Sequence, residues 1–182
     1  GQNNKDTYFI PLSEENIEHE VIFVPGYTRE NYHIFSCGEL VTTMARKGFF
    51  VDREVIDKTI AMISKNISEN GIVIFGGKFP MGLTKDDFYL ICDTIKSLGA
   101  KLVLDSNSVD INDILRVKPY LIKPNLAELA EMTHRDLSDI NTVLSTLTEL
   151  NLNGIENIIL SMDKDGLIYS SKEEKIRADV PC

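Results

Sequence analysis

The stretch from Gly71 to Asp105, GIVIFGGKFPMGLTKDDFYLICDTIKSLGAKLVLD, predicts a strand, a helix and a second strand in succession. Residues 71–75 and 101–105 are short apolar runs, and residues 84–98 have helical spacing. Because both runs are apolar along nearly their whole length, we expect them to be buried on both faces, in a parallel sheet covered by helices. This unit predicts an α/β fold of the doubly wound type with a mostly parallel sheet.

The same alternation continues on both sides of this unit. Its expected helices cover residues 52–68, 107–117, 125–132 and 138–150, and its expected strands cover residues 120–122 and 157–161. Residues 167–169 and 175–178 read as a hairpin at the edge of the sheet. The pattern places an α/β core at about residues 52–182.

The chain before Asp52 does not show this alternation of helices and strands. Residues 21–24, 32–35 and 40–44 are β-prone runs, interrupted by Pro25-Gly26 and Cys37-Gly38, which predicts a small antiparallel layer within about residues 20–50. Residues 4–16 could form a helix, although Pro11 argues against it. Since no Pro/Gly/Ser-rich linker separates the two regions, we expect one domain over residues 1–182, with a β lid.

Composition excludes several classes of protein. The 182 residues are 43% hydrophobic and 26% charged, as in globular proteins. A net charge of −9 argues against a nucleic-acid partner. Three scattered cysteines lead us to expect a reduced, cytoplasmic protein. The polar residues at 1–9 disfavour secretion, and the lack of an apolar run of 18 or more residues disfavours membrane insertion.

Polar residues follow each predicted strand, where open α/β sheets bind their ligands. Gly77 and Lys78 could bring backbone and a cation to a ligand, or form a plain surface turn. Asp105 could face the crevice or cap the next helix. Asp165 and Gly166 lie in a ligand loop or in a simple turn.

The segment after the strand at residues 120–122 offers the richest chemistry. Asn125 and Glu128 are three residues apart, which is the spacing of a helix cap with its acidic partner. Together with Lys123, they could equally converge on a phosphate and its magnesium ion, because Mg²⁺ prefers oxygen ligands and often binds through water. Local sequence favours the cap and leaves both interpretations open.

These strand ends, taken in order, resemble the PfkB (ribokinase-like) carbohydrate kinases, and most closely the branch that contains 1-phosphofructokinase and tagatose-6-phosphate kinase. The most specific match is YLIKPNLAEL at residues 120–129, which is similar to the Lys-Pro-Asn-x-x-Glu segment of that branch. Further matches lie at residues 24–31, 77–82, 104–106 and 160–166. The resemblance covers essentially the whole chain and implies a ribokinase-like fold.

The resemblance also implies a function. ATP would transfer its γ-phosphoryl group, with Mg²⁺ on the phosphates, to a sugar phosphate, converting fructose 1-phosphate to fructose 1,6-bisphosphate. A tagatose-6-phosphate kinase, or a non-catalytic paralogue that binds phosphosugar or nucleotide, is the alternative. A homodimer through the lid is implied as well.

Residue by residue, the family roles would fall on the matching positions of this chain. Lys123 would be catalytic, next to the transferring phosphoryl group, and Asn125 and Glu128 would hold the metal through water. The nucleotide would be bound by Ser161, Asp165 and Gly166. The sugar phosphate would be bound by Arg29, Asn31, Gly77, Lys78 and Asp105.

The chain also departs from the family pattern. Lys78 stands where the family turn has serine, His33 where the lid has lysine, and Asp163 where the nucleotide loop has glycine. The family's Gly-Ala-Gly-Asp segment, which supplies the general base, would lie beyond Cys182, and its first strand would precede Gly1. We therefore expect a truncated piece of a kinase with little or no activity of its own.

Overall fold

The computed structural model of the protein describes residues 1–179, which form two compact units. The lid unit comprises residues 1–65 and 79–88, and the sheet unit comprises residues 66–78 and the chain from residue 89 onward. A six-stranded, mostly parallel sheet with helices confirms the predicted α/β class. None of the helices within residues 1–179 is both long and apolar enough to span a membrane.

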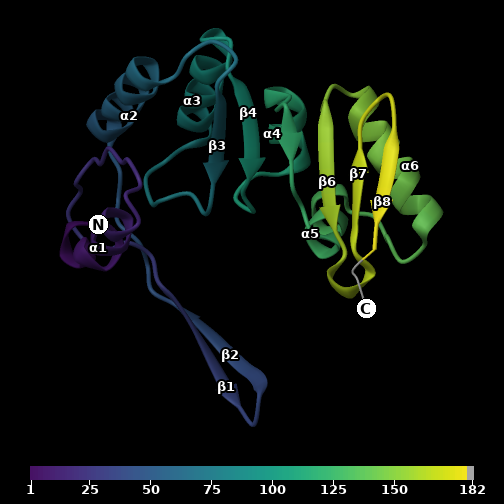
Figure 1. Cartoon of the computed structure of the whole chain (residues 1–182), viewed down its shortest axis with the longest axis horizontal. Helices are drawn as coiled ribbons and strands as arrows, with labels where there is room; N and C mark the ends of the chain where they lie inside the picture. Colours follow the sequence, from purple (N-terminus) through teal and green to yellow (C-terminus); the bar gives the residue numbers. More distant parts are fainter. Residues whose placement is uncertain (180–182) are drawn as a thin grey trace. The chain divides into compact units, whose positions relative to one another are not determined.

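The lid unit contains two short strands that extend as an arm away from α1 (Figure 1). Strands β1 (Asn31–Ser36) and β2 (Glu39–Ala45) pair antiparallel around the Cys37-Gly38 turn, as predicted, and every residue in them is exposed. The helical elements of this unit are η1 (Gln2–Asn4), α1 (Asp6–Glu14) and most of α2 (Arg53–Asn66). Pro11 lies inside α1, so the proline does not prevent this helix.

The prediction of a strand at residues 21–24 is wrong. The carbonyl of Val24, a buried residue, accepts a hydrogen bond from the Gln2 amide at 2.9 Å, and the Gly26 carbonyl accepts one from the Asn3 amide at 2.9 Å. This segment therefore pairs with the start of η1 rather than with a strand.

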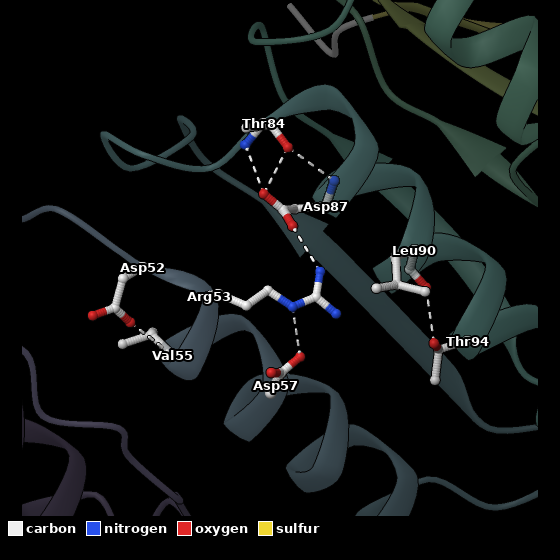
Figure 2. A network of polar contacts seen from close by, with 8 residues as sticks. All are labelled: Asp52, Arg53, Val55, Asp57, Thr84, Asp87, Leu90 and Thr94. Carbon is white, nitrogen blue, oxygen red and sulfur yellow. Dashed lines mark hydrogen bonds and ion pairs between the residues drawn. The ribbon is translucent and has the colours of Figure 1, made fainter.

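The first turn of α3 (Lys85–Ser97) is tied to α2 by a polar network within the lid unit (Figure 2). The Asp87 carboxylate accepts hydrogen bonds from the amide and hydroxyl of Thr84, at 3.1 and 2.6 Å, and these bonds lower its pKa. Arg53 of α2 forms ion pairs with Asp87, at 3.4 Å, and with Asp57, at 2.9 Å. Thr84 and Asp87 thus form a capping box that also anchors α2.

The sheet unit orders its strands as they follow in the chain, from β3 to β8. Strands β3 (Ile72–Gly76), β4 (Lys101–Asp105), β5 (Leu121–Ile122) and β6 (Asn157–Ser161) are parallel, whereas β7 (Leu167–Ser170) and β8 (Lys175–Ala178) continue the sheet antiparallel. The intervening helical elements are α4 (Ile111–Val117), α5 (Leu126–Thr133), α6 (Ile140–Leu152) and η2 (Asp163–Asp165).

Apolar spacing explains the core of this unit. In α6, Val143, Leu147 and Leu150 recur on one helical face and are buried, and the helix packs against β6 and β7 (Figure 1). Alternate residues of β6, Ile158 and Leu160, are fully buried.

The prediction of burial on both faces is wrong for β3. Ile72 is 65% exposed and Ile74 is 68% exposed. One face of this strand is therefore open among residues 1–179, although the sequence of the strand is apolar.

Candidate functional site

Strand register brings polar residues together at one edge of the sheet unit. Gly76 lies beside Asp105, Leu104 lies beside Ile122, and an isolated bridge joins Asn125 to Ser161. Parallel strands present their carboxyl ends at the same edge, so the residues that follow β3, β4, β5 and β6 gather there. We refer to these residues as the strand-end cluster: Gly77, Lys78, Asp105, Ser106, Lys123, Asn125, Glu128 and Ser161.

An ion pair joins two members of the cluster. The Lys123 ammonium lies 3.6 Å from the Asp105 carboxylate, and both side chains are about half exposed. Asp110, not Asp105, caps the next helix, α4. Of the two roles open to Asp105, the structure thus excludes the cap and directs its carboxylate toward the neighbouring strand end.

Asn125 and Glu128 form the capping box that their spacing predicted. The Asn125 side chain accepts a hydrogen bond from the Glu128 amide at 2.8 Å, and the Glu128 carboxylate accepts one from the Asn125 amide at 2.9 Å. The second carboxylate oxygen of Glu128, Oε1, has no hydrogen-bond partner in the described part of the chain. The cap therefore uses one oxygen of Glu128 and leaves the other available.

Hydrogen bonds hold the turn after β3 against the end of β4. Gly77, at φ 83°, donates its amide hydrogen to the Asp105 carbonyl at 3.0 Å and accepts a hydrogen bond from the Ser106 hydroxyl at 2.5 Å. No atom lies within 4 Å of the position a Cβ of Gly77 would take, so the positive φ, rather than crowding, favours glycine here. Lys78, next in the chain, is exposed and forms no ion pair within residues 1–179.

The loop after β6 is a tight turn, as one of its two interpretations predicted. The Met162 amide donates to the Gly166 carbonyl at 2.8 Å, and Gly166 has φ 85°. A Cβ on Gly166 would lie 2.0 Å from the Ala178 carbonyl oxygen, so only glycine fits beside β8. Ser161 donates its amide hydrogen to the Pro124 carbonyl at 3.1 Å, which connects this loop to the Lys123 segment. The nucleotide-binding roles of Ser161, Asp165 and Gly166 stay predictions.

Two predicted substrate ligands belong to the lid unit. Arg29 precedes β1, is exposed, and forms no ion pair in the part of the chain that the structure describes. Asn31 is the first residue of β1 and lies opposite Ala45 of β2. Their substrate-binding roles stay predictions.

Sequence reasoning missed two features of the cluster. It did not pair Lys123 with Asp105, and it gave the Ser106 hydroxyl no role. The strand register carries the signal for both, because adjacent parallel strands place residues distant in sequence side by side. Within residues 1–179, no group of three or more His, Cys, Asp or Glu side chains is arranged to hold a metal ion directly.

Comparison with known proteins shows which kinases resemble this chain. The 1-phosphofructokinase of Haemophilus influenzae is 26% identical over 179 residues, which cover 98% of this chain and 57% of that protein. The D-tagatose-1-phosphate kinase of Bacillus licheniformis is 29% identical over 169 residues, which cover 92% and 54%, respectively. The chain thus spans little more than half the length of these relatives.

Solved structures share the fold. The crystal structure of phosphofructokinase-2 from Escherichia coli in complex with fructose-6-phosphate superimposes with a TM-score of 0.86 at 19% identity, covering 97% of this chain and 59% of that one. Ribokinase from Giardia lamblia gives a TM-score of 0.72 at 13% identity, covering 97% and 55%. The fold is therefore ribokinase-like, as predicted.

A sequence profile gives the family itself. The profile of pfkB family carbohydrate kinases matches residues 41–181, which is well over half of the chain and includes the whole strand-end cluster. The chain belongs to the pfkB family of carbohydrate kinases.

Proposed function

We propose that this chain forms part of an ATP-dependent sugar-phosphate kinase that converts fructose 1-phosphate to fructose 1,6-bisphosphate. The observation that carries the proposal is the ion pair of the Lys123 ammonium with Asp105 at the strand-end edge, two residues before the capping box of Asn125 and Glu128. Relatives named 1-phosphofructokinase support the choice of reaction. A cytoplasmic location belongs to the same proposal.

Lys123 would act on the phosphoryl group in transfer. Phosphoryl transfer depends on positioning and on neutralising the charge spread over the phosphate oxygens, and an ammonium group supplies such charge. In the proposal, Ser161, Asp165 and Gly166 border the nucleotide. Gly77, Lys78 and Asp105 bind the sugar phosphate. Arg29 and Asn31 of the lid unit are proposed separately as substrate ligands, with Arg29 for the phosphate that the sugar already carries.

The cluster fits a hydrated magnesium ion better than a directly coordinated one. One carboxylate oxygen of Glu128 takes no part in the cap, whereas the side-chain oxygen of Asn125 accepts a capping hydrogen bond. A single free carboxylate oxygen suits a contact through water, which Mg²⁺ often retains. When bound, the ion would neutralise charge on the ATP phosphates, while Glu128 would orient its water shell.

We assign the general base to no residue of this chain. Asp105 pairs with Lys123, and the proposal gives the free oxygen of Glu128 to the water shell of the metal ion, so neither carboxylate is assigned as the base. The proposal therefore gives residues 1–182 ligand binding without turnover.

The test is calorimetric titration of MgATP and of fructose 1-phosphate into the 182-residue chain, compared with its Lys123→Met variant. We expect the chain to bind MgATP and the variant to bind it at least about tenfold more weakly, because charge-assisted hydrogen bonds contribute about 1.5 to 3 kcal/mol. Equal affinity in the two chains would refute the role of Lys123. Steady-state turnover by the 182-residue chain would refute the absence of a base.

Tagatose phosphates are the alternative acceptors. Relatives named tagatose-6-phosphate kinase and D-tagatose-1-phosphate kinase are 25 to 29% identical to this chain, close to the values for 1-phosphofructokinases. Titration of fructose 1-phosphate, tagatose 1-phosphate and tagatose 6-phosphate at equal concentration would rank the three sugars. Binding of nucleotide without any of these sugars would favour the non-catalytic paralogue.

We also propose a homodimer through the lid. Every residue of β1 and β2 is exposed, and these include large apolar side chains: Phe35 and Val41 are each 62% exposed. Apolar patches of this kind commonly mark an interface. Light scattering should show association that Phe35→Lys weakens, and association that the substitution leaves unchanged would exclude the lid.

A further inference from the structure

Arg29 lies between two residues of the lid unit that the same side chain binds. The Asn4 side chain donates hydrogen bonds to the Thr28 carbonyl, at 3.2 Å, and to the Glu30 carboxylate, at 2.8 Å. Its oxygen accepts a hydrogen bond from the Thr28 amide at 2.8 Å. The amide group of Asn4 thus pairs with both backbone polar groups of Thr28, as the backbone of a neighbouring strand would. Asn4 therefore holds the chain on both sides of Arg29.

The Glu30 carboxylate also binds a second arginine of the lid unit. It forms an ion pair with Arg46 at 3.3 Å, and the Arg46 amide donates to the Glu30 carbonyl at 2.9 Å. The Arg46 guanidinium also lies over the Tyr27 ring, 4.5 Å from its centroid. Hydrogen bonds from Tyr32 and Asn4 lower the pKa of Glu30, so this carboxylate is ionised at neutral pH. The charge of Arg46 is therefore compensated.

The backbone of Arg29 is held in place while its side chain is exposed. Its carbonyl accepts a hydrogen bond from the Tyr8 hydroxyl at 3.4 Å. A Cβ on Gly48 would lie 3.3 Å from the Arg29 Cβ, so the start of the Arg29 side chain packs closely against this glycine. The Arg29 guanidinium forms no ion pair within residues 1–179. Arg29 thus combines a fixed origin with an available charge, which suits the capture of an anion.

We propose that Asn4 and Glu30 are positioning residues that aim the Arg29 guanidinium at the phosphate group of the acceptor sugar. This inference rests on the substrate-binding role proposed above for Arg29. Asn4 fixes the backbone from which the guanidinium extends, and a group that is ordered before binding loses less conformational entropy on binding. Glu30 compensates the charge of Arg46, so Arg46 does not compete with Arg29 for the anion.

Two measurements on the 182-residue chain test this proposal. Amide hydrogen exchange at Thr28 reports the contact with Asn4 without any ligand, and calorimetric titration of fructose 1-phosphate reports binding. Asn4→Ala removes the hydrogen bonds of Asn4 without changing the net charge. Asn153→Ala is its matched control, because the Asn153 side chain also donates to a backbone carbonyl, that of Glu149 at 2.9 Å, but lies in the sheet unit.

Asn4→Ala should speed exchange of the Thr28 amide and weaken fructose 1-phosphate binding, each by about two- to tenfold, which is the range for a neutral hydrogen bond. Asn153→Ala should change neither. Arg29→Met alone should weaken binding at least about tenfold, because it removes a charge-assisted hydrogen bond. The affinity for MgATP should be the same in wild type and Asn4→Ala, which verifies that the variant is folded.

The loss of affinity caused by Arg29→Met should itself depend on the positioning residues. It should be smaller in chains that already carry Asn4→Ala, where Arg29 is no longer held, or Glu30→Gln, where Arg46 is released to bind the anion. A residue that only stabilises the lid unit would leave this loss unchanged. The comparison is made within each background, so the charge removed by Glu30→Gln does not affect it.

The outcomes separate this inference from the proposed function. A chain that binds no fructose 1-phosphate, or binds it as well after Arg29→Met, would overturn both. If Arg29→Met weakens binding but costs the same affinity in the Asn4→Ala and Glu30→Gln backgrounds, only the positioning role is overturned. Exchange of the Thr28 amide that Asn4→Ala leaves unchanged would overturn the positioning role as well, whatever the ligand result.

Discussion

Neutralising Asp105 should strengthen the binding of phosphate anions at the strand-end cluster. In the wild-type chain, the Asp105 carboxylate forms an ion pair with the Lys123 ammonium at 3.6 Å and so competes with a phosphate anion for it. Because both side chains are half exposed, the aqueous value of the Coulomb energy applies, which at this distance is about 1 kcal/mol. Asp105→Asn removes this competition and the repulsion of an incoming anion, so affinity should rise by about fivefold.

The assay is calorimetric titration of inorganic pyrophosphate without magnesium, so that the measured heat comes from binding of the free anion and not of its magnesium complex. The gain should shrink as salt rises, because exposed charges are screened at about 10 Å in 0.1 M salt and more strongly above it. The same substitution should weaken the binding of fructose 1-phosphate, since Asp105 is a proposed ligand of the sugar. Opposite changes for the two ligands separate the two roles of this carboxylate.

A second background tests the mechanism. In a chain that already carries Lys123→Met, Asp105→Asn should change pyrophosphate affinity less, because the ion pair is already gone. Asp93→Asn is the control for net charge: it breaks another exposed ion pair, with Arg116 at 2.7 Å, away from the cluster. The reasoning fails if Asp93→Asn raises affinity as much as Asp105→Asn does, or if the gain persists in full without Lys123.

Further outcomes are expected at Asp87, Cys92 and Asp163. Asp87→Ala should lower the free energy of unfolding by about 1 kcal/mol in urea titrations, because it removes the capping box of α3. The hydrogen bonds from Thr84 lower the pKa of Asp87, so the stability that this carboxylate contributes is present above its unfolded pKa and is lost as the pH falls through the lower folded pKa. The free energy of unfolding of the wild-type chain should therefore decline more in acid than that of Asp87→Ala. An equal decline in the two chains would contradict this. Burial raises the pKa of Cys92 to about 12, whereas Cys37 is exposed. After brief thiol labelling at pH 8, mass spectrometry should therefore find Cys37 modified and Cys92 unmodified. Labelling of both cysteines at equal rates would refute the burial of Cys92. Asp163 has φ 49°, so Asp163→Gly should match or exceed wild-type stability by up to about 1 kcal/mol, whereas a β-branched valine there should be clearly destabilising.

Local sequence patterns predicted most of the secondary structure. The helices and strands from Arg53 to Ala178 lie within a few residues of their expected ranges, because apolar periodicity and turn residues act over short separations. The capping box of Asn125 and Glu128 follows from the same locality, since its partners are three residues apart. The segment at residues 21–24 escaped this reasoning, because its backbone partners lie some twenty residues earlier, in η1.

The sequence alone determined the order of helices and strands and the PfkB-like motif at residues 120–129, because each depends on residues near one another in the chain. Only the tertiary structure decided that Asp105 meets Lys123, eighteen residues away. That contact depends on the register of two parallel strands. Tertiary structure likewise left Ile72 and Ile74 exposed, because burial depends on which elements cover a strand and not on how apolar the strand itself is.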